Sequence, residues 1–222
     1  MSLTTLCREK CREICRKKRE QMSKTTFLIG CTHFGHEKMY KFINYDGTKV
    51  RPFENAKEAD AVMLENWNSV VGVDDKVYVL GDVAFTSESL SILKKCNGKK
   101  ILIKGNHDDL SVGEYMKYFK DIRSSSRLDN AILSHIPIHP DSLFREKHNT
   151  YWLNIHAHLH NRAVPLIHRD FDTEQGSIAD MQRINGINDK DPRYFSVCVE
   201  RIGYKPISID EIRNLTNPKS AV

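Results

Sequence analysis

Short apolar runs recur along this chain, and most of them end directly in a glycine or a polar loop. The runs occupy residues 26–30, 76–80, 100–104, 131–134, 151–155 and 194–201, and the last one alternates apolar and polar side chains as a strand does. Two of the intervals, 55–70 and 87–95, have helical composition, with Ser87 as the expected N-cap of the second. Strands that alternate with helices predict an α/β fold around one core.

Polar side chains of one chemical kind follow these runs. The carboxyl ends of strands in an α/β sheet meet along one rim, so the residues after them should share a cavity. A single His in a loop is usually a surface residue. Eight metal-type side chains at successive strand ends instead predict a metal site: Cys31, His33, Asp82, Asn106, His107, His135, His158 and His160.

The net charge of the chain lies in its first residues. Residues 1–24 hold eight basic and three acidic residues, which accounts for the whole net charge of +5. We therefore predict a basic N-terminal extension over 1–24 and one domain over 25–222. Cys7, Cys11 and Cys15 would share one face of a marginal helix in the extension. Residues 161–193 show no period and predict an insertion with little regular structure.

Several classes of protein are disfavoured by the composition. The neutral domain argues against a long nucleic-acid substrate, which needs several phosphate contacts. No stretch approaches the roughly 18 uninterrupted apolar residues of a membrane helix. The charged N-terminus does not resemble a signal peptide, and the six Cys do not resemble a secreted disulfide framework. We expect a cytoplasmic protein without a membrane partner.

The polar loops resemble the motif series of the calcineurin-like metallophosphoesterases, D-x-H, G-D, G-N-H-[DE], a lone His and G-H-x-H. Here the series reads Cys31-Thr-His33, Gly81-Asp82, Gly105-Asn106-His107-Asp108, Ser134-His135 and Ala157-His158-Leu159-His160. Residues 51–53, 67–68 and 205–209 are similar to a small bacterial and phage branch of the family. The resemblance covers residues 26 to about 210 and implies two mixed β-sheets packed as a sandwich flanked by helices.

The resemblance also implies a dimetal phosphoesterase. Asp82 would bridge two divalent metal ions (Mn, Fe or Zn). One ion would be completed by Cys31, His33 and His160, and the other by Asn106, His135 and His158. The implied reaction is hydrolysis of a phosphomonoester or phosphodiester, a small molecule or nucleotide, by a metal-activated water.

The remaining polar residues of the motifs have supporting roles in this prediction. His107 would be the general acid. Asp108 would either orient the His107 ring or cap the helix that follows. His36 and Arg51 would contact the substrate, and His156 would support the last motif by hydrogen bonding.

Two residues depart from the family pattern. Ala157 replaces a Gly, which would strain the backbone if a positive φ were needed there. Cys31 replaces the first Asp, and a thiolate favours zinc or iron over manganese at its site. Three alternatives follow: a working enzyme biased toward zinc or iron, a slow enzyme, or an inactive scaffold that acts as a binding protein. Cys31 could also point away from the metals.

Overall fold

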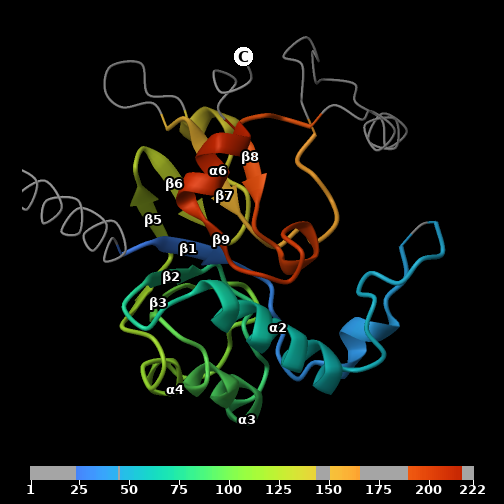
Figure 1. Cartoon of the computed structure of the whole chain (residues 1–222). Helices are drawn as coiled ribbons and strands as arrows, with labels where there is room; N and C mark the ends of the chain where they lie inside the picture. Colours follow the sequence, from blue (N-terminus) through green and yellow to red (C-terminus); the bar gives the residue numbers. More distant parts are fainter. Residues whose placement is uncertain (1–23, 45, 144–150, 166–189, 217–222) are drawn as a thin grey trace, which may run out of the picture.

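The computed structural model describes residues 24–44, 46–143, 151–165 and 190–216, and its strands form two mixed sheets (Figure 1). The three Cys of the predicted N-terminal helix and most of the predicted insertion lie outside the described residues. The boundary after residue 24 therefore stays a prediction. Within the described ranges, no helix is both long and apolar enough to cross a membrane.

The first sheet contains the earliest strands of the chain. Its order is β4-β3-β2-β1-β9, in which β1 to β4 are parallel and β9 is antiparallel to β1. The strands are β1 (Thr26–Ile29), β2 (Lys76–Val79), β3 (Lys99–Ile103), β4 (Asp121–Arg123) and β9 (Ile207–Ser208). Because β1, β2 and β3 are parallel neighbours, their carboxyl ends lie along the same edge of the sheet.

The second sheet has the order β5-β6-β7-β8, with β5 antiparallel to β6 and the other neighbours parallel. Its strands are β5 (Ser125–Leu128), β6 (Ala131–Ser134), β7 (Leu153–His156) and β8 (Tyr194–Ser196). One apolar cluster contains Leu28 and Ile103 from the first sheet and Leu133 and Ile155 from the second, all fully buried. The two sheets thus share a core, which confirms two mixed sheets and is compatible with the expected sandwich.

Helices cover the other face of the first sheet (Figure 1). They are α2 (Ala56–Val70), α3 (Ser87–Leu90) and α4 (Val112–Tyr115), with the 3₁₀ turns η1 (Glu37–Lys41) and η2 (Ser91–Lys94). Trp67 and Met63 of α2 are buried in the same cluster as Val79 of β2. Asn55 caps α2 by accepting from the Glu58 backbone N–H. The cap of α3 is Thr86, so the expected Ser87 cap is wrong by one residue.

The end of the chain differs from the prediction. The alternation over 194–201 predicts one long strand, whereas β8 ends at Ser196 and Val199–Arg201 forms the 3₁₀ turn η5. The turn brings Glu200 beneath the candidate site, as shown below. Helix α6 (Ile209–Thr216) directly follows β9, and the short η3 (Pro140–Leu143) follows β6. Strands β4, β5 and β9 were not predicted, because they are short and partly polar.

Candidate metal centre

The predicted donors come from strand ends in both sheets and meet at one place. Cys31 and His33 follow β1, Asp82 follows β2, Asn106 follows β3, His135 follows β6, and His158 and His160 follow β7. Two groups of three converge, with all ligand atoms in each group within 4.8 Å of one another. The groups are Cys31, His33 and His160, and Cys31, Asp82 and His135. These residues could hold metal ions.

Asp82 lies between imidazoles from the two groups. Its Oδ2 is 3.8 Å from His33 Nε2 and 3.3 Å from His135 Nε2. Asn106 Oδ1 is 2.9 Å from His135 Nε2, and the His158 ring centroid is 5.1 Å from that of His135. Asn106 and His158 are therefore beside the second group, where the resemblance places them, although they are not members of either converging group.

The surroundings of two imidazoles, His33 and His135, fit a metal site. Both ring nitrogens of His33 are buried without a hydrogen-bond partner in the described part of the chain. Burial lowers the pKa of His33 to about 3, so its ring is neutral and retains a lone pair. His135 Nδ1 lies 2.7 Å from the Leu80 carbonyl, which can only accept, so Nδ1 carries a proton and Nε2 is directed toward Asp82 and Asn106. Metal-ligating His residues commonly donate their second ring N–H in this way. Burial acts to lower the pKa of His135, but the hydrogen bonds with Asp82 and with the Leu80 carbonyl outweigh it and raise the pKa.

The Cys31 side chain points into the centre. Its Sγ belongs to both converging groups, accepts from the His158 backbone N–H at 3.1 Å and lies 3.7 Å from Cys198 Sγ. The alternative in which Cys31 points away is therefore wrong. Burial, and then the hydrogen bond from Cys198, raise the pKa of Cys31 well above its ordinary value. Without a metal ion this sulfur is thus a protonated thiol.

The backbone is strained at most of the donors. Five of the eight described non-glycine residues with positive φ are candidate ligands: Cys31 (53°), His33 (48°), Asp82 (55°), His158 (68°) and His160 (51°). Such conformations cost about 1–3 kcal/mol each and concentrate at functional sites. The rest of the fold must therefore hold these five residues in place.

Ala157 does not carry the strain that was considered for it. The positive φ occurs at the next residue, His158. The Ala157 methyl group fits because Gly30, which lies against it, has no side chain: a Cβ on Gly30 would lie 2.6 Å from Ala157 Cβ. Gly105 is required by a similar close approach, since its Cβ would lie 2.3 Å from Asp82 Oδ1.

Asp108 has neither of its two predicted roles. Its carboxylate accepts backbone N–H groups of Gly105 at 2.8 Å, Asp82 at 2.9 Å and Val83 at 2.9 Å. The N-cap of α4 is Ser111. No described contact joins the Asp108 carboxylate to the His107 ring. Asp108 instead ties the loop after β2 to the loop after β3, so it positions Asp82.

Arg51 is fully buried, at 0% exposure. Its guanidinium donates to the carbonyls of Cys31 at 2.6 Å and Thr32 at 2.9 Å, and to Glu200 Oε1 at 2.8 Å. These contacts hold the loop that carries Cys31, and they leave the predicted direct contact between Arg51 and the substrate without support in this structure.

Glu200 was missed by the sequence reasoning. Its Oε1 accepts from His160 Nδ1 at 3.0 Å as well as from Arg51. Burial acts to raise the pKa of Glu200, but the hydrogen bond from His160 and the charge of Arg51 outweigh it and lower the pKa to about 2. Glu200 thereby directs His160 Nε2 toward the site. The signal that could have revealed it is an acidic residue just after a strand end, as at the other donors.

Three rings surround the open side of the centre. His107 is exposed, and its ring centroid lies 6.2 Å from that of His33 and 5.4 Å from that of Phe85. The His36 ring lies 4.3 Å from Phe85. The His107 backbone N–H donates to Asp82 Oδ1 at 2.9 Å, and this hydrogen bond fixes the position of the His107 backbone. The structure thus places both predicted residues at the rim, together with Phe85, which was not predicted.

His156 lies away from this open side. It is buried, with Nδ1 2.8 Å from the carbonyl of Ala157, the residue before His158. This contact agrees with the supporting hydrogen bond expected of it.

Comparisons with known proteins reveal two relatives in sequence. No family model matches the chain. The uncharacterized protein MJ1445 of Methanocaldococcus jannaschii is 31% identical over 196 residues, which cover 85% of this chain and 89% of that protein. The gene 66 protein of Mycobacterium phage L5 is 28% identical over 170 residues, covering 63% of this chain and 79% of that protein. Similar proteins therefore occur in an archaeon and in a phage.

A solved structure aligns with most of the chain. The protein of unknown function AQ665 from Aquifex aeolicus aligns with a TM-score of 0.58 at 27% identity and covers 87% of this chain and 100% of its own. The phosphopantetheinyl hydrolase of Mycobacterium tuberculosis aligns with a TM-score of only 0.27 at 18% identity, covering 58% of this chain and 48% of its own. That second likeness is too weak to carry an argument about function.

Proposed function

The chain belongs to the family of MJ1445, whose name assigns no activity, and we propose from the site itself that it is a dimetal-dependent phosphoesterase. One observation carries the proposal. Donors from four strand ends in two sheets converge in the two groups Cys31–His33–His160 and Cys31–Asp82–His135. A purely structural cluster would not leave both ring nitrogens of His33 buried and without partners among the described residues.

The converging groups, together with the motif resemblance, indicate which residues would hold the ions. Cys31, His33 and His160 would hold one ion, and Asp82, His135, Asn106 and His158 the other, with Asp82 placed to reach both. Two bound cations would polarise the phosphoryl oxygens of a substrate and lower the pKa of a water. The thiolate at position 31 favours zinc or iron in the first group.

The rim residues supply the rest of the chemistry. The exposed His107 ring would donate a proton to the leaving alkoxide, the step that limits esters with poor leaving groups. His36, beside Phe85, would donate a hydrogen bond to the substrate phosphate. Arg51, Glu200 and Asp108 would act on the substrate only through the loops and rings that they hold.

A second candidate function is a metal-binding scaffold without turnover. The raised pKa of the buried Cys31 favours it, because a protonated thiol is a poor ligand. The scaffold would bind metal weakly at the first group and would hydrolyse no ester.

Metal analysis combined with hydrolysis assays tests the proposal. Protein loaded in turn with Mn²⁺, Zn²⁺ and Fe²⁺ is assayed for bound metal and for hydrolysis of p-nitrophenyl phosphate and bis-p-nitrophenyl phosphate. We expect two ions per chain and turnover in at least one loaded form. Asp82→Asn should lower both the amount of bound metal and the rate of hydrolysis. Activity of Asp82→Asn within about threefold of the wild type would remove Asp82 from the mechanism, and metal binding without turnover in all forms would support the scaffold.

A further inference from the structure

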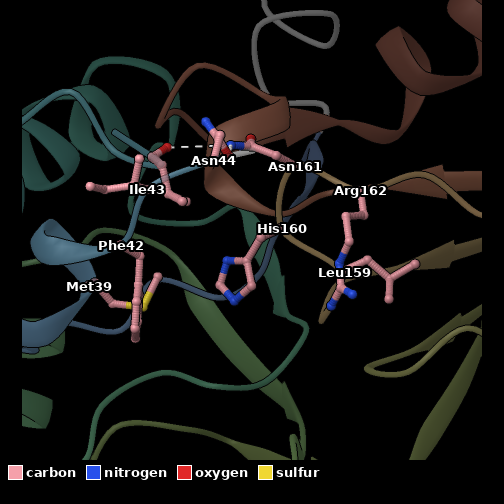
Figure 2. Close-up of a pocket in the computed structure, with 9 residues that line it drawn as sticks. Met39, Phe42, Ile43, Asn44, Leu159, His160, Asn161 and Arg162 are labelled. Carbon is pink, nitrogen blue, oxygen red and sulfur yellow. Dashed lines mark hydrogen bonds between the residues drawn. The ribbon is translucent and has the colours of Figure 1, made fainter. Parts of the chain in front are cut away.

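A groove of about 480 Å³ opens directly beside the first group of metal donors (Figure 2). One of its walls is His160, whose ring projects into the view between Phe42 and Arg162. The groove thus shares His160 with the first group of candidate metal donors. We call it the His160 groove.

The wall opposite Arg162 is apolar. Figure 2 shows Met39, Phe42 and Ile43 on this side, and Val50 and Leu159 also line the groove. Phe42 is 50% exposed and Ile43 is 66% exposed, which is unusual for large apolar side chains placed together. Apolar surface that lines a concave site is typical of ligand pockets, where it surrounds a few polar groups.

The apolar wall is held against the loop after β7. Asn161 Nδ2 donates to Asn44 Oδ1 at 3.4 Å, as drawn in Figure 2, and lies 3.5 Å from the Val50 carbonyl. Ile43 pairs with Lys49 in an isolated antiparallel bridge. The groove is therefore a built feature of the fold rather than a gap between two unconnected loops.

Arg162 brings a positive charge to the border between the groove and the metal centre. It is exposed, and its guanidinium forms no hydrogen bond or ion pair with the other residues that the structure describes. Its charge acts on His158: burial and then His135 lower the pKa of His158, and Arg162 adds to that effect. A guanidinium in this position matches the geometry of a phosphate group.

We propose that the His160 groove binds a large apolar organic group of the phosphoester substrate while Arg162 binds its phosphate. This inference rests on the proposed phosphoesterase function and narrows its substrate class. The phosphate would lie against the metal donors, and its organic group would extend along Leu159 toward Phe42 and Ile43. Esters of small polar alcohols would leave this apolar wall in water.

Binding of phosphonates tests the inference without requiring turnover. Methylphosphonate and 1-naphthylphosphonate carry the same head group and differ in apolar area. Their dissociation constants are measured by calorimetry on Zn²⁺-loaded protein, because the Cys31 thiolate favours zinc. We expect the naphthyl compound to bind about tenfold more tightly or better, from the apolar area that it removes from water. In the double variant Phe42→Ser/Ile43→Ser, both sites being solvent-exposed, this ratio should fall to about threefold or less.

Two further variants separate the charge from the apolar wall. Arg162→Gln should weaken both phosphonates by about tenfold or more and keep their ratio, because it removes a charged hydrogen-bond donor. Val73→Ser is the matched control, since Val73 is 73% exposed and lies in the turn before β2, and it should keep the wild-type ratio. Equal affinity of the wild type for the two phosphonates, or a ratio that survives in the double variant, would overturn the inference. Absence of ester hydrolysis with the naphthyl preference intact would overturn the proposed function instead.

Discussion

Neutralising Glu200 should destabilise the protein even when no metal is bound. Glu200 is the partner of the fully buried Arg51, with a distance of 2.8 Å between Nε and Oε1, and it is itself only 1% exposed. In Glu200→Gln the amide can still accept a hydrogen bond, but the guanidinium loses its counter-charge. Breaking a buried ion pair from one side typically costs about 3–5 kcal/mol.

The pKa of Glu200 provides a second measure of the same effect. It falls from the ordinary 4.5 to about 2 in the folded protein. Each tenfold change in the acid constant corresponds to about 1.4 kcal/mol, so the folded environment favours the charged form by about 3 kcal/mol. Because the folded pKa is lowered, this stability is present above pH 4.5 and is lost as the pH falls toward 2. The two measures agree on about 3 kcal/mol at neutral pH.

Urea denaturation of the metal-free protein at pH 7 would measure this loss. We expect Glu200→Gln to lower the free energy of unfolding by about 3 kcal/mol, and Arg51→Met/Glu200→Gln to lower it by less than the sum of the two single changes. Glu65→Gln is the control, because Glu65 is exposed in the middle of α2 and Gln has a similar helix propensity. A Glu200→Gln effect below about 0.5 kcal/mol, or additive effects in the double variant, would refute the reasoning.

Three other substitutions test the site and its packing. Cys31→Asp should raise Mn²⁺-supported hydrolysis about tenfold or more, whereas Cys31→Ser should not; equal rates in all three proteins would show that position 31 does not control the metal. His107→Asn should keep both ions and lose about 10²–10⁴-fold in kcat on alkyl esters, with a smaller loss on nitrophenyl esters; loss of metal would make it a ligand. Gly30→Ala should lower the free energy of unfolding, measured by urea denaturation, by about 1–3 kcal/mol, because the new methyl group meets Ala157. Adding Ala157→Gly to this variant should restore much of the lost free energy, and a double variant no more stable than Gly30→Ala would show that the strain lies elsewhere.

Local patterns in the sequence predicted the strands that carry the donors. The runs before Asp82 and His135 end within one residue of the observed strands β2 and β6. Each donor could be identified because it directly follows an apolar run. The motif resemblance then assigned the donors to two groups. The structure brings Cys31, His33 and His160 together, whereas the second converging group joins Cys31 to Asp82 and His135 and leaves Asn106 and His158 beside it.

The contacts that support the donors were not predictable in the same way. Arg51 and Glu200 are 149 positions apart in the sequence, and no local period connects them. The same holds for Asp108, whose carboxylate reaches back 26 residues to the Asp82 backbone N–H. In the sequence, the Asp of a G-N-H-D motif is equally compatible with a helix-capping residue. The role of Asp108 therefore became clear only from the contacts between the loops after β2 and β3.

The division of the donors between two sheets links metal affinity to the interior of the protein. His33 and Asp82 are carried by the first sheet, whereas His135 and His160 are carried by the second. An ion held by both sheets binds only when their separation is correct, so it adds its binding free energy to the cohesion of the whole domain. A substitution that leaves a cavity at Leu133 or Ile103, in the core between the sheets, would consequently lower the metal affinity even though neither residue touches the ion.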